Sequence, residues 1–196
     1  MMMRIDQIAA LFIMLAFYIA YFIKMYLQKQ RGIRTHQINQ GTKPPETKRV
    51  EMVMSVATLV IVVAELLSIV LDWQMFVQKP LLITSLMVAA IGVLIFIFAM
   101  ITMRDSWRAG INESEKTQLV TSGIYQFSRN PAFLGFDLMY IGILMTFFNI
   151  PLLVFTVFAI LSLHFQIRGE EAFLITAFGA PYEEYMQHTC RYIGRK

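Results

Sequence analysis

Charged residues and cysteines are scarce in this chain. Asp, Glu, Lys and Arg make up 15% of its 196 residues, against roughly a quarter in a soluble domain. Because 57% of the residues are hydrophobic, much of the surface must face a solvent other than water, and we expect a lipid bilayer. The single cysteine, Cys190, excludes an intrachain disulfide.

The sequence motifs of several enzyme classes are also missing. The chain has no GxxxxGK[ST] phosphate loop, no CxxC pair and no HExxH sequence, so nucleotide hydrolysis, redox chemistry and zinc chemistry have no motif behind them. The net charge of +4 comes from basic residues beside apolar segments, where membrane orientation and anionic lipids explain it. We therefore expect no metal and no nucleic-acid partner.

The chain instead contains four long apolar stretches. Residues 5–27, 50–71, 80–103 and 131–167 each approach or exceed the length of about 20 residues that crosses a bilayer. The first is too long for a signal-peptide core, and the last is too long for one crossing. Proline disfavours helix at the residue before it, so Asn149-Ile150-Pro151 predicts a tight turn between helices at about 131–149 and 151–167.

These segments predict an all-α integral membrane protein with about five transmembrane helices. Residues 1–103 would hold three of them. Residues 104–196 would hold a cytosolic connector (104–130), the helical hairpin and a cytosolic tail (168–196) with a C-terminal helix. We interpret residues 35–48, with Pro44 and Pro45, as an irregular cytosolic loop.

The distribution of Lys and Arg predicts the orientation. The segments that follow the first, third and fifth helices carry most of the basic residues, and only Arg4 and Lys79 remain for the other side. The positive-inside rule therefore places the N-terminus outside and the C-terminus in the cytosol.

Unusual polar residues gather in two segments, 107–135 and 164–191. A tight hairpin brings the start of the fourth span and the end of the fifth together, so these segments would form one cytosolic site. Asn130 is a favoured N-cap and Pro131 suits the first helical turn, where backbone amides favour an anionic group. Alternatively, Asn130 and Pro131 only start a helix and Arg129 is an interfacial anchor.

The second polar segment carries Glu170 and Glu171 directly after the fifth span. A helix that continues through Glu170 places Gln166 one turn earlier on the same face. The alternative interpretation is that both glutamates are ordinary solvated charges beyond a helix end.

Together the two segments resemble the isoprenylcysteine carboxyl methyltransferases and their phospholipid-methylating and bacterial relatives. The signature of that family runs L-V-x-x-G-x-Y, R-H-P-x-Y-x-G, a helical hairpin, E-E-x-x-L and F-G-x-x-Y-x-x-Y. Here it reads LVTSGIY, RNPAFLG, EEAFL and FGAPYEEY, in that order. The match runs from Thr117 to Tyr185.

The resemblance implies an S-adenosylmethionine-dependent methyltransferase, most similar to the bacterial members and expected in a bacterial inner membrane. Its acceptor would be lipophilic: an isoprenoid, a lipid headgroup, or a hydrophobic thiol or acid that arrives from the membrane lipids. The resemblance assigns catalytic positions to Arg129, Asn130 and Glu170, and substrate binding to Gln166. It assigns donor contacts to Thr117, Gln118, Leu119, Val120, Tyr125, Asn130, Pro131, Ala132, Phe133 and Glu170.

Two positions depart from the family pattern. The histidine of R-H-P is Asn130, which can form hydrogen bonds but cannot titrate near neutral pH. An arginine of the prenylcysteine enzymes, four residues before the first glutamate, is Gln166, which carries no charge and counts against a prenylcysteine substrate.

Two other functions stay open. An ionisable group in a membrane helix is a functional candidate, and Glu65 with Asp137 would be the residues of a transporter; we expect instead that Glu65 lies near the interface or is paired inside the bundle. A non-catalytic protein on the same fold is the other alternative, because Asn130 and Gln166 replace family residues.

Overall fold

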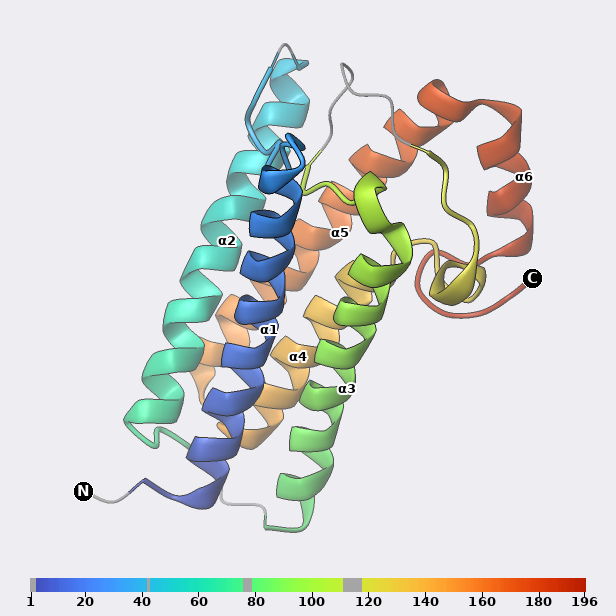
Figure 1. Cartoon of the computed structure of the whole chain (residues 1–196). Coiled ribbons are helices and arrows are strands. Elements are labelled where there is room, and N and C mark those ends of the chain that lie inside the picture. Colours follow the sequence, from blue (N-terminus) through green and yellow to red (C-terminus); the bar gives the residue numbers. More distant parts are fainter. Residues whose placement is uncertain (1–2, 42, 76–78, 111–117) are drawn as a thin grey trace.

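The computed structural model describes residues 3–41, 43–75, 79–110 and 118–196 (Figure 1). Within these residues every regular element is a helix, and the two isolated β-bridges, His36 with Ala109 and Thr189 with Arg195, lie outside them. The α-helices are α1 (Ile5–Gln30), α2 (Pro45–Val70), α3 (Lys79–Met103), α4 (Pro131–Thr146), α5 (Ile150–Phe178) and α6 (Ala180–His188), with short 3-10 turns η1 (Arg104–Ser106) and η2 (Gly123–Gln126).

Four helices, α1, α2, α3 and α5, are long and apolar enough to cross a membrane. They contain 25 to 29 residues each. The all-α membrane fold is therefore confirmed. The predicted fourth span is shorter than expected, because α4 has 16 residues, or about 24 Å, against a hydrocarbon core of about 30 Å.

Two predicted helix boundaries were wrong. Helix α2 begins at Pro45 rather than residue 50, because proline is favourable in a first helical turn as well as in a loop. Helix α5 continues past residue 167 to Phe178, so Glu170 and Glu171 lie inside it rather than in a tail. Gly179, with φ of 59°, then separates α5 from α6.

The predicted turn at Asn149 is confirmed. Asn149 caps α5 by accepting a 2.9 Å hydrogen bond from the amide of Leu152. Its Nδ2 atom donates to Ser68 Oγ at 2.9 Å and to the carbonyl of Trp73 at 3.0 Å. Asn149 therefore ends the hairpin turn and joins it to the end of α2.

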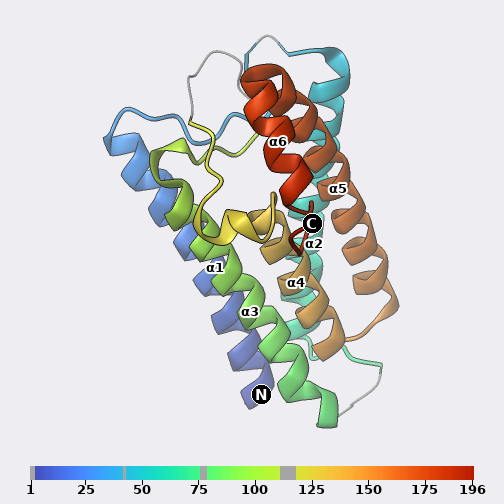
Figure 2. The ribbon, with the colours of Figure 1, turned by 90° about the vertical axis from the view of Figure 1, so that its right-hand side faces the viewer.

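Helices α4 and α5 pack mainly against other helices rather than each other. Helix α4 lies along α3 and α5 lies along α2 (Figure 2). Small residues allow the first contact: a Cβ atom on Gly142 would lie 2.5 Å from the amide nitrogen of Ala89, and one on Gly135 would lie 2.7 Å from the carbonyl oxygen of Gly92. Small residues of this kind let membrane helices approach closely.

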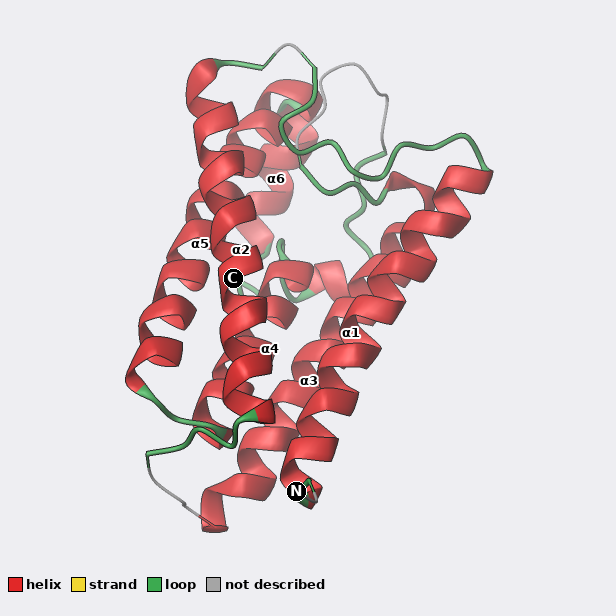
Figure 3. Cartoon of the chain, turned by 90° about the vertical axis from the view of Figure 1, so that its left-hand side faces the viewer, coloured by secondary structure: helices red, strands yellow, loops and turns green. Residues whose placement is uncertain are grey.

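The segments predicted to lie on one side of the membrane do meet at one end of the bundle. Lys24 Nζ donates to the carbonyl of Arg104 at 2.7 Å, and Arg31 pairs with Asp105 at 2.8 Å. At the opposite end, Arg4 pairs with Asp72 at 2.8 Å (Figure 3). The end that holds the site is thus the one with most basic segments, and its cytosolic orientation stays a prediction.

Candidate functional site

A cavity of about 740 Å³ lies among α1, α2, α4 and α5. Its walls also include the segments before α4 and the side chains of α6. This volume is within the range of roughly 300–1,000 Å³ that small-molecule sites occupy. The lining is mostly apolar and aromatic, with polar side chains at a few places.

Most of the residues predicted to contact a methyl donor line this cavity. They are Gln118, Leu119, Val120, Tyr125, Asn130, Ala132, Phe133 and Glu170, and Arg129, which was predicted as catalytic, lines the cavity as well. Pro131 and Gln166 are not part of the lining, and Thr117 lies outside the described residues. Asn130 and Glu170, which are 40 positions apart in the sequence, therefore share one cavity.

Glu170 is the acidic side chain of the cavity wall. The residue is half-buried, and Gln166 Nε2 donates a 3.0 Å hydrogen bond to its Oε1 atom. Gln166 itself is buried behind Glu170, with 1% of its surface exposed. The predicted stripe of the two residues on one helix face is present, and the contact makes Gln166 a partner of Glu170 rather than a part of the wall.

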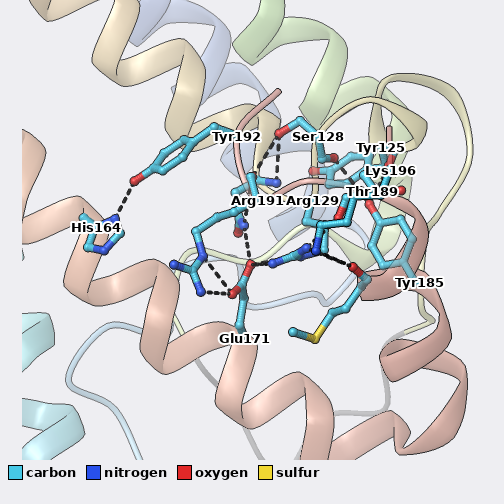
Figure 4. A network of polar contacts seen from close by, with 12 residues as sticks. Tyr125, Ser128, Arg129, His164, Glu171, Tyr185, Thr189, Arg191, Tyr192 and Lys196 are labelled. Carbon is cyan, nitrogen blue, oxygen red and sulfur yellow. Dashed lines mark hydrogen bonds and ion pairs between the residues drawn. The ribbon is translucent and has the colours of Figure 1, made fainter. Parts of the chain in front are cut away.

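Glu171, the neighbouring glutamate, holds a buried polar network (Figure 4). Its Oε1 atom accepts from Arg129 Nη2 at 2.9 Å and from Asn130 Nδ2 at 3.0 Å. Its Oε2 atom accepts from Arg191 Nη2 at 2.7 Å. Arg129 also donates through Nη1 to the carbonyl of Thr189 at 2.5 Å. The network ties α5, the start of α4 and the C-terminal segment together.

Asn130 occupies the predicted N-cap position, but its side chain does not cap α4. The amide NH2 group points instead to the Glu171 carboxylate and to the carbonyl of Arg191, at 3.3 Å. Both of these are acceptors, so they fix which atom of the side chain is the nitrogen. The start of α4 is thereby held by a hydrogen bond from a neutral amide to the Glu171 carboxylate, which does not depend on a titrating histidine.

Helix α6 closes the cavity on the side of η2. The Tyr185 hydroxyl donates to the carbonyl of Tyr125 (Figure 4), and Tyr182 is buried with 2% of its surface exposed. Burial raises the pKa of the Tyr125, Tyr182 and Tyr185 phenols above the ordinary value. These phenols therefore stay neutral at physiological pH and can donate hydrogen bonds.

The loop between α1 and α2 contributes to the site, which sequence reasoning missed. His36 and Ile38 line the cavity, and the Gln37 amide donates to the carbonyl of Ala109 at 2.8 Å. A buried ion pair between Lys43 Nζ and Glu51 Oε1, 2.7 Å apart, fixes the loop to α2. An isolated lysine followed eight residues later by a glutamate has no recognisable sequence signal.

The cavity also reaches the surface that faces lipid. Phe22 of α1 and Leu59 of α2 both line the cavity, and 56% and 66% of their respective surfaces are exposed. Contacts between α1 and α2 are few in comparison with those between α3 and α4. The cavity lining therefore includes side chains that are exposed on the outer surface of α1 and α2.

A comparison with protein families identifies this arrangement. Residues 81–176 match the model of the isoprenylcysteine carboxyl methyltransferase family. The chain belongs to this family. Members of the isoprenylcysteine carboxyl methyltransferase family are methyltransferases that use S-adenosylmethionine, so the chain is a membrane methyltransferase with that cofactor. No curated protein matches the sequence.

The lining residues fit S-adenosylmethionine chemically. A carboxylate such as Glu170 can accept hydrogen bonds from an ammonium group or from hydroxyls. The indole Nε1 of Trp107, a buried donor without a hydrogen-bond partner among the described residues, lines the same cavity and suits an acceptor atom of a ligand. Tyr125 and Phe133 provide aromatic faces for a base or a sulfonium cation. The matched segment includes Arg129, Asn130 and Glu170, whereas α1, α2 and α6 lie outside it.

Proposed function

We propose that this cavity binds S-adenosylmethionine near Glu170 and the start of α4, and that the enzyme methylates a lipophilic acceptor that enters between α1 and α2. The single observation that supports this most strongly is that one cavity joins Asn130 and Glu170 of the family segment to the lipid-exposed Phe22 and Leu59. A donor from the aqueous side and an acceptor from the membrane can meet there.

The bound donor supplies a methyl group on a sulfonium: the acceptor's lone pair forms the new bond to carbon while the carbon–sulfur bond breaks, leaving S-adenosylhomocysteine. The protein's task in such a displacement is to align the two reactants and to exclude water. Glu170, held by Gln166, would orient the donor through its hydrogen-bonding groups. Tyr125 and Phe133 would cover it with aromatic surface.

Arg129 and Asn130 would act by positioning the start of α4. The hydrogen bonds of Arg129 to Glu171 and to the C-terminal carbonyls hold α4 at the depth where its first turn meets the cavity. Asn130 would complete this first turn without exchanging a proton. Gln166, at the position where the prenylcysteine enzymes have an arginine, carries no charge and contacts Glu170 instead of the cavity, which favours an acceptor other than a prenylcysteine carboxylate.

The test is transfer of radiolabelled methyl groups from S-adenosylmethionine to membrane lipid extracts by the purified protein. Label should enter the organic phase, and Glu170→Gln should lower the rate on the order of tenfold or more, as the loss of a charge-assisted contact does. Glu184→Gln, on the exposed face of α6, is the matched control and should keep the wild-type rate.

The two alternative functions give different results. A non-catalytic protein would bind S-adenosylhomocysteine and transfer no label to any extract. A transporter would move solute in a proteoliposome flux assay without methyl transfer. Either result would overturn the proposed function.

A further inference from the structure

A cluster of polar groups without partners lies beside the part of the cavity formed by α1, α2 and α4. Glu65 is completely buried, and neither of its carboxylate oxygens has a hydrogen-bond partner among the described residues. The hydroxyl groups of Tyr18 and Tyr140 interact with each other, but neither forms a hydrogen bond of normal geometry within the described residues. The expectation that Glu65 is paired inside the bundle is therefore not met among the described residues, and its position relative to the membrane interface stays a prediction.

These three side chains belong together, although they come from three helices. The Glu65 carboxyl group acts electrostatically on the hydroxyls of both Tyr18 and Tyr140. Both tyrosines line the cavity, whereas Glu65 does not. Tyr140 is buried as completely as Glu65, so the cluster presents two phenol groups to the cavity with a carboxyl group next to them.

The titratable groups of this cluster are all acids. Asp137 lies one turn before Tyr140 on α4, and its Oδ1 atom also has no partner in the described part of the chain. Neither carboxylate oxygen of Glu65 has a cationic hydrogen-bond partner in the described part of the chain. Each unpartnered buried polar group lowers stability unless something satisfies it, and an acidic cluster is satisfied best by a cation.

Aromatic rings surround the same region. Phe136 packs against Phe17 with ring centroids 4.6 Å apart and against Tyr140 at 5.9 Å, and all three line the cavity. The faces of aromatic rings attract cations, and a dry surrounding strengthens that attraction. Rings with an acid beside them are the composition that recognises an ammonium group.

We propose that Tyr18, Tyr140 and Glu65 form a subsite for the amino group of an amine-bearing lipophilic acceptor. This inference rests on the proposed function, which it narrows to amines. A tyrosine hydroxyl has one donor and can also accept, so each tyrosine can donate to one oxygen of Glu65 and accept from an N–H of the ligand. The two tyrosines thus connect the ammonium group to the carboxylate of Glu65, which would take one proton from it so that the neutral amine has the lone pair needed to accept the methyl group.

The experiment compares two probes of equal chain length, dodecylamine and 1-dodecanol, with the full chain in phosphatidylcholine nanodiscs. The change in Trp107 fluorescence, in a Trp73→Phe background, reports occupation of the cavity. Dodecylamine should bind the wild type on the order of tenfold more tightly than dodecanol, and Glu65→Gln should remove this preference. Tyr140→Phe, which deletes one oxygen, should reduce it.

Thr156→Val is the matched control, because Thr156 is another buried hydroxyl without a described partner and does not line the cavity. It should keep the preference for the amine. An equal affinity for both probes, or a preference that survives Glu65→Gln and Tyr140→Phe, overturns the subsite.

Calorimetry with S-adenosylhomocysteine on the same samples separates the two proposals. Normal binding by Glu65→Gln together with a lost amine preference supports both. If the wild type binds S-adenosylhomocysteine normally but does not prefer the amine, the proposed methyl-donor site stands and the proposed subsite is overturned. An amine preference in a protein that does not bind S-adenosylhomocysteine removes the proposed function alone.

Discussion

Asn130 donates a 3.0 Å hydrogen bond to Glu171, although 41 positions separate the two residues and Glu170 is the one that faces the cavity. Successive helix residues differ by about 100° around the axis, so the two glutamates point in different directions. Glu171 joins the start of α4 to α5 and the C-terminal segment, and Glu170 remains available to a ligand.

Replacing Glu171 by glutamine should destabilise the protein. The change leaves Arg129, whose side chain is 5% exposed, as a buried cation with no carboxylate, which costs about 3 kcal/mol. Thermal unfolding in detergent measures the effect. Asp105→Asn, which breaks the exposed pair with Arg31, is the control and should cost less than about 1 kcal/mol. Equal unfolding temperatures for the two variants would refute the structural role of the network.

Replacing Gly142 by alanine should separate α3 from α4. The new Cβ would lie 2.6 Å from the carbonyl oxygen of Ser85, so the backbones must move, at a cost of roughly 1–3 kcal/mol. The unfolding temperature should fall, and the cavity should lose ligand affinity because α4 forms one wall. Met145→Leu, at a 40% exposed site of the same helix, should change neither. A stable Gly142→Ala protein would mean that the close approach is not required.

The sequence predicts the fold well where a local rule decides the structure. The apolar stretches indicate α1, α3 and the α4–α5 region, and Asn149 followed by Pro151 indicates the turn between the last two. Hydrophobicity gives no sharp end to a helix that leaves the membrane, so the continuation of α5 beyond residue 167 was not predicted. Prolines at 44 and 45 fit both a loop and a helix start, which explains the misplaced start of α2.

The site was predictable only where the family motif covers it. The motif places Asn130 and Glu170 correctly around one cavity, but the roles of individual residues stay predictions. Contacts between distant segments, such as Lys43 with Glu51 or Tyr185 with Tyr125, depend on tertiary packing and leave no periodic or local pattern. The walls that α1 and α2 contribute could not be found from the sequence for the same reason.

The ion pair of Lys43 and Glu51 should be necessary for the cavity to form. Lys43→Met removes the ion pair that Lys43 forms with the 0% exposed Glu51, so the α1–α2 loop should detach and expose His36 and Ile38. We expect a loss of about 3 kcal/mol in stability and faster hydrogen exchange in residues 33–40. Lys48→Met, on the first turns of α2, is the control. Unchanged exchange in the loop of the Lys43 variant would contradict the assignment.

Gln166→Leu should weaken donor binding through Glu170. The change removes the hydrogen bond that Gln166 Nε2 donates to Glu170 while it keeps the buried volume, and a hydrogen bond to a charged group contributes about 1.5–3 kcal/mol. The affinity for S-adenosylhomocysteine should fall on the order of tenfold. Thr176→Val, which deletes an exposed hydroxyl on the last turns of α5, should have no effect. A variant that loses acceptor turnover and keeps donor affinity would place Gln166 at the acceptor instead.

Isothermal titration of the purified protein with S-adenosylhomocysteine tests the central claim most directly. The wild type should bind one equivalent, and Glu170→Ala should bind on the order of tenfold or more weakly. Lys29→Glu, in the exposed last turn of α1, should bind as the wild type does. The absence of heat and of a thermal shift at saturating ligand, or undiminished binding by Glu170→Ala, would contradict the account.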